Sequence, residues 1–306
     1  MASWRARLTN LILRWVIKPS LGRNEDLSAA RLEAVRRRGV WCAKWLIKPV
    51  KGTTVRPVSE AGVRGEWVLA PGVRDDRAVF FVHGGGFIIG SPAIYRNLVS
   101  RLSLAAGCAV FSVDYRLAPE HPYPAPLDDV LKAWRWLTSA SLGAHQVAAA
   151  GDSAGGNLVL ATLMRLSRAA EPLPAAVVTM APWTDLSLSG NSVAENRRAD
   201  PYIPANMLRP VAAAYLHGAD PCLPEVSPLF GDFSLFPPTL IHVGSSEVLL
   251  DDALRLEGVV KQSGVEVTLK IWHGLPHVFQ LFAPFVPEGR RSLEELGSFI
   301  RRHLAD

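Results

Sequence analysis

Residues 151–155 read Gly-Asp-Ser-Ala-Gly and fit the pattern G-x-S-x-G. A short small-sided run precedes the pattern and a helical stretch follows it, which is the context that an exposed nucleophilic serine requires. The neighbours of a serine in such a sharp turn must be small, and Gly151, Gly155 and Gly156 meet this requirement. A helix start also supplies free backbone N–H groups. The pattern predicts that Ser153 is a nucleophile rather than part of an ordinary glycine-rich turn.

A second glycine-rich segment, His-Gly-Gly-Gly-Phe at 83–87, follows a predicted buried strand. Consecutive glycines let the backbone approach a substrate closely. Their N–H groups suit the negative oxygen of a tetrahedral intermediate, where the loss of one donor costs about 3–4 kcal/mol. A phosphate-binding loop is the alternative, but the Lys-Ser/Thr of that motif is missing. We expect His83 to be structural and to orient this loop by hydrogen bonds.

A serine nucleophile needs a histidine base, which follows the acid in the chain order Ser, acid, His. Three of the histidines after Ser153 lie in a predicted strand, the terminal helix and a long insertion (His242, His303 and His217). His273 and His277 instead share a loop after the last predicted strand. We favour His277, because Gly274 and Pro276 form a turn that projects it. His273 remains an alternative.

The acid of such a site is expected after the seventh predicted strand. Glu247 comes first in that loop, followed by Asp251 and Asp252. The two aspartates stand at a helix start, where carboxylates are ordinary caps and dipole partners. The order along the loop therefore favours Glu247 as the group that orients the histidine.

Strands alternate with helices from residue 53 onward, which predicts a mostly parallel, doubly wound sheet. The first two strands lack a helix between them and are expected to form an antiparallel edge. The expected strands are 53–58, 63–69, 78–82, 109–113, 147–150, 176–180, 239–243 and 267–271. The expected helices are 92–106, 126–139, 154–169, 251–263 and 289–304, with a further helical run at 204–217.

Two regions fall outside this alternation. Residues 1–50 look helical, and more than 50 residues separate the sixth and seventh strands. A loop of that length is usually structured or functional. We therefore expect an N-terminal helical cap segment at 1–50, a catalytic domain at 51–184 and 226–306, and a cap insertion at 185–225.

The N-terminal segment is basic and amphipathic. Trp4, Leu8, Leu11 and Trp15 recur at helical spacing, and Lys and Arg outnumber Asp and Glu around them. No cleavage site of a signal peptide follows, and no apolar run reaches the roughly 18 residues of a membrane span. Periodicity does not decide between a stripe that faces protein and one that faces lipid. The need for an apolar roof over the nucleophile favours the cap, so contact with a membrane surface is the less favoured alternative.

Composition narrows the function classes. The 306 residues are 49% hydrophobic and 20% charged, with a net charge of +5, which fits a globular chain rather than a disordered one. No nucleic-acid-binding motif accompanies the positive charge. Three scattered cysteines argue against a disulfide framework and a zinc site, and they fit a reducing, cytoplasmic setting.

These motifs together give a family resemblance. The chain resembles the hormone-sensitive-lipase-like bacterial esterases of the α/β-hydrolase fold, over about residues 75–305. The resemblance rests on four segments: 83–87, Asp-Tyr-Arg-Leu-Ala-Pro-Glu-His at 114–121, Gly-Asp-Ser-Ala-Gly-Gly-Asn at 151–157, and Gly-Leu-Pro-His-Val-Phe at 274–279. It implies an eight-stranded sheet flanked by helices with a helical cap, and hydrolysis of short- to medium-chain acyl esters without a metal or organic cofactor.

The resemblance also implies roles for residues. Ser153 is the expected nucleophile and His277 the expected base. The oxyanion hole is expected from the backbone N–H groups of Gly84, Gly85 and Ala154. The acid of the family is usually Asp, and Glu247 stands at the matching position here. We interpret the segment 114–120 as a buried charge network that braces the loop under the site.

Three other functions share this fold or these catalytic groups. A non-catalytic ligand receptor of the same fold would lack the histidine, which is present here. A peripheral lipase acting on long-chain acylglycerols is favoured only by the basic N-terminus, and an amidase would use the same catalytic groups. The expected partner is a small-molecule ester, and the sequence leaves open whether the chain is a monomer or a homodimer.

Overall fold

The computed structural model describes residues 2–22, 27–140 and 142–304. Arg23, Glu25 and Asp26 of the basic N-terminal segment lie outside these residues. Among the described residues, no helix is long and apolar enough to cross a membrane.

The centre of the molecule is one eight-stranded sheet in the order β1-β2-β4-β3-β5-β6-β7-β8. β2 pairs antiparallel with β1 and β4, and the other neighbours pair parallel, so the predicted antiparallel edge is confirmed. Strands β4 to β7 are buried along their whole length, which matches their nearly continuous apolar sequences. The strands are β1 (Thr54–Glu60), β2 (Val63–Leu69), β3 (Arg74–Val82), β4 (Cys108–Val113), β5 (Val147–Asp152), β6 (Ala176–Met180), β7 (Thr239–Gly244) and β8 (Val267–Trp272).

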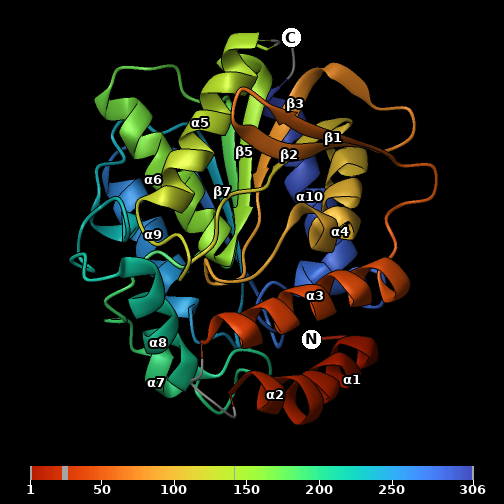
Figure 1. Cartoon of the computed structure of the whole chain (residues 1–306), viewed down its shortest axis with the longest axis vertical. Coiled ribbons are helices and arrows are strands. Elements are labelled where there is room, and N and C mark those ends of the chain that lie inside the picture. The colour runs from red at the N-terminus through yellow and green to blue at the C-terminus, as the bar shows by residue number, and fades with distance from the viewer. Residues whose placement is uncertain (1, 23–26, 141, 305–306) are drawn as a thin grey trace.

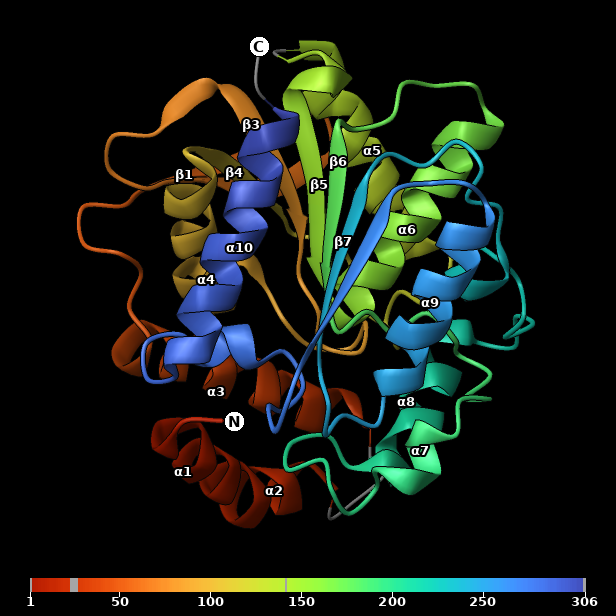
Figure 2. The same cartoon turned by 180° about the vertical axis from the view of Figure 1, so that it is seen from behind.

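Helices cover both faces of this sheet. α4 (Pro92–Ala106) and α10 (Pro287–His303) pack against each other on one face, which lies to the left in Figure 2. α5 (Ala125–Ala140), α6 (Ser153–Arg168) and α9 (Leu250–Gln262) cover the other face (Figure 1). For α4, α5, α6 and α9 this division follows from right-handed crossovers, because the chain steps one way along the sheet from β3 to β4 and the other way from β4 onward.

A separate group of helices lies at the end of the molecule toward which the parallel strands point (Figures 1 and 2). It combines the N-terminal segment with the insertion after β6, and α2 contacts α8. Its members are α1 (Trp4–Ile12), the π-helical turn η1 (Leu13–Ile17), α2 (Lys18–Gly22), α3 (Ala29–Leu46), α7 (Ser192–Glu195) and α8 (Ala205–Leu216).

The predicted apolar stripe of the first helix does not face the protein. Ala6 and Leu13 are the buried positions, whereas Trp4 and Trp15 are 68% and 73% exposed. Leu8 and Leu11 are half exposed. The stripe therefore contributes nothing to an apolar roof, although other residues of the N-terminal segment do.

Candidate active site

Ser153 stands in a tight turn between β5 and α6. Its φ of +50° is in the left-handed region, which costs energy for a residue with a side chain. The glycines around it are required by close contact. A Cβ on Gly151 would lie 2.6 Å from the carbonyl oxygen of Gly155, and a Cβ on Gly155 would overlap the carbonyl oxygen of Val82. The turn thus lifts the serine out of the sheet and leaves the first N–H groups of α6 without intrahelical partners.

Asp152 ties this turn to the glycine loop, which we define as residues 83–90. Its Oδ1 accepts the Gly84 N–H at 2.9 Å, and its Oδ2 accepts the Tyr95 hydroxyl at 2.8 Å. The carboxyl is 1% exposed. Burial raises the pKa of Asp152 to about 7, although both hydrogen bonds favour the charged form. The loop and the serine turn are therefore held in one fixed arrangement.

This contact corrects one assignment. The Gly84 N–H, expected in the oxyanion hole, is already engaged by Asp152. The next two glycines, Gly85 and Gly86, have φ values of +110° and +61° and line the same cavity as Ser153. In the described part of the chain, neither of their N–H groups donates to a protein acceptor. These two groups and the Ala154 N–H at the start of α6 are the available donors.

His83 orients the glycine loop, as expected. Burial lowers the pKa of His83 to about 4, so the ring is neutral. Its Nδ1 lies 2.8 Å from the Gly84 carbonyl oxygen and donates to it. The Tyr115 hydroxyl donates to the His83 carbonyl at 2.8 Å, and the two rings stack 4.4 Å apart. The hydrogen bonds of His83 and Tyr115, both neutral, therefore hold the glycine loop in place.

His277 and Glu247 form a buried pair. The His277 Nδ1 lies 2.7 Å from Glu247 Oε2, and Glu247 Oε1 accepts the Gly244 N–H at 2.5 Å. Burial acts to lower the pKa of His277, but the Glu247 charge and hydrogen bond outweigh it and leave the pKa above 6.5. With Nδ1 held by the carboxylate, Nε2 is the nitrogen available to take a proton in the cavity.

The alternatives to these residues lie elsewhere. His273 is exposed and does not line the cavity. Asp251 accepts the Ser192 N–H at 3.0 Å, and Asp252 accepts the Thr184 and Asp185 N–H groups at 2.6 and 2.9 Å. Both aspartates therefore anchor the insertion to the start of α9.

Ser153 and His277 meet in one apolar cavity of about 320 Å³. Among the described residues, the Ser153 Oγ makes no hydrogen bond, so the two side chains share the cavity without a direct bond. The walls come from the N-terminal helices, the glycine loop and the start of α4, the insertion, and the segments after β7 and β8. They include Leu21, Val35, Gly39, Ile88, Ile89, Ile94, Ile203, Met207, Leu208, Val211, Leu249, Val278 and Leu281. No group of three or more potential metal ligands occurs in the described residues.

Asp200 is a buried carboxylate that the sequence analysis missed. Its Oδ2 accepts the Val248 N–H at 3.0 Å, and its Oδ1 accepts the Tyr202 and Ile203 N–H groups at 2.7 and 3.0 Å. It therefore links the cavity wall to the loop of Glu247, and its charge also favours protonated His277. The only signal in the sequence was an Asp-Pro pair, which indicates no more than a turn.

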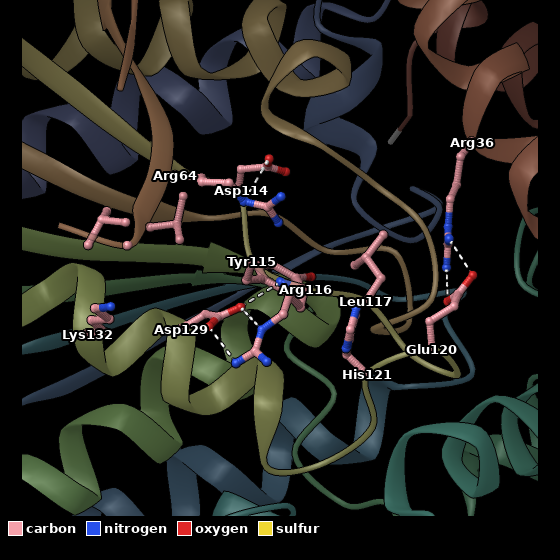
Figure 3. Close-up of a pocket in the computed structure, with 13 residues that line it drawn as sticks. Arg36, Arg64, Asp114, Tyr115, Arg116, Leu117, Glu120, His121, Asp129 and Lys132 are labelled. Atoms are coloured by element: carbon pink, nitrogen blue, oxygen red, sulfur yellow. Dashed lines mark hydrogen bonds and ion pairs between the residues drawn. The ribbon is translucent and has the colours of Figure 1, made fainter. Parts of the chain in front are cut away.

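The charged residues of segment 114–120 are not a buried network, contrary to expectation. They border an open polar pocket of about 600 Å³, shown in Figure 3. Arg116 pairs with Asp129 at 2.8 Å, and Asp114 lies 3.9 Å from Arg64 with 42% of its side chain exposed. The charged groups of this segment therefore lie at the surface. The segment contacts the glycine loop through the hydrogen bond from the Tyr115 hydroxyl to the His83 carbonyl.

Arg36 of α3 connects this pocket to the glycine loop. It pairs with Glu120 at 2.8 Å, as Figure 3 shows. It also donates to the Ile88 carbonyl at 2.9 Å and to the Ala118 carbonyl at 3.0 Å. The N-terminal segment is thereby fastened to the loop that carries Gly85 and Gly86.

Comparison with known proteins places these features in a family context. Residues 79–281 match the family model described as alpha/beta hydrolase fold. An acetyl-hydrolase of Streptomyces hygroscopicus is 42% identical over 236 residues, which cover 77% of this chain and 79% of that protein. The carboxylesterase/phospholipase LipF of Mycobacterium tuberculosis is 36% identical over 98% of this chain and 82% of its own length. A solved esterase of the bacterial hormone-sensitive lipase family superposes with a TM-score of 0.92, at 37% identity over 100% of both chains.

Proposed function

The chain belongs to the α/β-hydrolase family, among the bacterial hormone-sensitive-lipase-like esterases, and is a carboxylic-ester hydrolase; from this premise we propose that it works through an acyl-enzyme on Ser153. The observation that carries the proposal is the cavity in which a serine on a strained turn shares space with a histidine held by a buried carboxylate. That combination is the signature of an activated nucleophile.

The proposed reaction has two halves. Ser153 Oγ attacks the ester carbonyl while His277 Nε2 takes its proton, and Glu247 stabilises the imidazolium that forms. The oxyanion accepts hydrogen bonds from the N–H groups of Gly85, Gly86 and Ala154. His277 then protonates the departing alkoxide, and an alcohol leaves. Water then attacks the acyl-enzyme carbonyl while His277 Nε2 takes its proton. His277 returns that proton to Ser153 Oγ as the bond between Oγ and the acyl carbon breaks, which releases the acid and restores the serine hydroxyl.

We further propose that residues 1–50 and 185–225 form the cap of this site. Leu21, Val35 and Gly39 from the first segment, and Ile203 and Met207 from the second, line the cavity. A roof of this kind excludes water and receives an acyl chain. The volume of about 320 Å³ is at the low end of the range of about 300–1,000 Å³ for small-molecule sites, which favours short- to medium-chain acyl groups.

Two measurements test the proposal. An organophosphonate should add its mass to Ser153, as read by peptide mass spectrometry, and Ser153→Ala should lose both labelling and ester hydrolysis. A series of 4-nitrophenyl esters of increasing acyl length should show kcat/KM reaching a maximum at short or medium length. Esterase activity retained in Ser153→Ala would refute the nucleophile. Rates that rise steadily into long-chain esters would refute the chain-length assignment alone.

A further inference from the structure

Helix α1 and the π-helical turn η1 that continues it carry exposed apolar residues on the side turned away from the protein. The positions that contact the molecule are Ala6 and Leu13, which are 1% and 3% exposed. The opposite side holds Trp4, Leu8, Leu11 and Trp15, which are 68%, 50%, 53% and 73% exposed. An ordinary surface helix has the reverse arrangement, with its apolar stripe facing the core. This stripe is therefore left uncovered by the folded chain.

Helix α3 lies at the same end of the molecule and also carries exposed tryptophans (Figures 1 and 2). Trp41 and Trp45 are 60% and 58% exposed, whereas Val35 and Gly39 on its other side line the cavity. Nine of the fifteen large apolar side chains exposed in the described residues fall between positions 4 and 45. The concentration is too strong for the scattered exposed apolar residues that most surfaces carry.

Positive charge accompanies the apolar side chains. The described residues 2–22 and 27–51 contain eleven Lys and Arg residues and a single acid, Glu33. Arg5 and Arg7 lie next to the stripe on α1, and Arg37 and Lys44 lie beside the tryptophans of α3; all four are exposed. Tryptophan is suited to the boundary between lipid and water, and exposed cations beside it are attracted to anionic head groups.

We propose that these helices dock the protein on an anionic lipid bilayer. We call the docking residues the N-terminal face: Trp4, Arg5, Arg7, Leu8, Leu11, Trp15, Arg37, Trp41, Lys44 and Trp45. Charge favours a membrane over a second copy of the chain. A symmetric dimer would bring the same patch onto itself and place two strongly positive surfaces in contact, whereas an anionic bilayer neutralises the charge.

Docking on this face would set the cavity close to the lipid. α3 presents Trp41 outward and Gly39 inward, so one helix, about 10 Å across, separates the bilayer surface from the cavity wall. The proposal concerns binding alone and does not depend on which ester is hydrolysed.

Flotation of the full-length protein with vesicles tests the proposal. Vesicles of phosphatidylglycerol and phosphatidylcholine in equal parts are compared with vesicles of pure phosphatidylcholine. Leu11→Ser/Trp15→Ser removes part of the stripe, and Arg5→Gln/Arg7→Gln removes charge. The matched control is Leu235→Ser/Phe285→Ser, because these residues are 65% and 51% exposed and lie outside the N-terminal face. Hydrolysis of a dissolved short-chain ester should be equal in all four proteins, which reports intact folding.

The wild type and the control should float with the anionic vesicles and not with pure phosphatidylcholine. The Leu11/Trp15 variant should bind at least about tenfold more weakly, equivalent to about 1.4 kcal/mol. Raising salt to about 1 M, where the screening length is about 3 Å, should weaken wild-type binding more than that of the Arg5/Arg7 variant. Absent flotation of the wild type, or equal binding by the Leu11/Trp15 variant and the control, would overturn the proposal. So would a wild-type dimer in sedimentation that the Leu11/Trp15 variant abolishes, since a second copy would then cover the face.

Discussion

Replacing Glu247 by Gln tests the assignment of the triad acid most directly. The change keeps the size of the side chain but removes the charge that lies 2.7 Å from His277 Nδ1. An amide nitrogen turned toward Nδ1 would leave the ring proton on Nε2, where the base must instead accept a proton. The variant thus holds the histidine in the wrong tautomer.

The size of the effect follows from this geometry. Substitution of the equivalent acid in a serine protease, with the site otherwise intact, lowers kcat by about 10⁴-fold, or about 5 kcal/mol of barrier. The same loss is expected here, because Glu247 is fully buried and no other carboxylate bonds to His277 in the described residues.

The pH profile gives a second measurement. In the wild type, Glu247 raises the pKa of His277 above 6.5, so the acidic limb of kcat/KM should lie above that pH. Without the carboxylate, burial remains and lowers the pKa. The limb of the residual activity in Glu247→Gln should therefore move to lower pH. Rates of hydrolysis of a 4-nitrophenyl ester, measured between about pH 5 and 9, show the acidic limb of the wild type and that of the variant.

Asp251→Asn is the matched control. Its carboxylate bonds to the Ser192 N–H, so the change should cost about 1 kcal/mol of stability, as for a helix cap, and leave kcat almost unchanged. A large loss of kcat in Asp251→Asn together with a small one in Glu247→Gln would refute the assignment.

Three further predictions follow from contacts around the cavity. Gly155→Ala should fail to fold or lose all activity in a solubility and esterase assay, because its Cβ would overlap the Val82 carbonyl oxygen; a soluble, active variant would contradict this. Arg36→Met should lower kcat by loosening the glycine loop, while a Glu120→Gln control that keeps both carbonyl contacts should lower it less; equal effects would assign the role to the ion pair alone. The pKa of Asp252 is raised by burial to about 7, so the stability it contributes is complete below the usual value of about 4 and is lost as pH rises through 7. The melting temperature of Asp252→Asn should accordingly fall less between these pH values than that of the wild type.

Local pattern was enough to predict most of the sheet. Seven of the eight strand predictions lie within two residues of the observed bounds, since buried parallel strands are short apolar runs between turns. The exception is β3, which begins at Arg74 rather than 78. Its first residues, among them Asp75 and Asp76, are charged and exposed, and no apolar signal marks them.

The serine turn was also predictable, because its residues are close in sequence. The His277–Glu247 pair spans 30 residues and was predictable from the known order of nucleophile, acid and base along the chain. Gly84 was misassigned because its N–H is engaged by Asp152, a partner 68 residues away. The direction of the α1 stripe was equally hidden. An apolar stripe has the same period whether it faces the protein or the outside, and only the burial of Ala6 and Leu13 shows that it faces away from the protein.

The cavity is bounded by two kinds of residue that differ in how freely they can change over evolutionary time. Its floor includes Ser153, which is held by a turn in which a carbon added to Gly151 or Gly155 would meet backbone. Its roof is different: a Cβ on Gly39 would meet only the end of the Ile94 side chain at 3.0 Å, and Met207 is itself a flexible side chain. Mutations that change the length of acyl chain that the cavity accepts should therefore accumulate in the N-terminal segment and the insertion. Homologous enzymes can therefore differ in the ester that they prefer while they keep the same reaction.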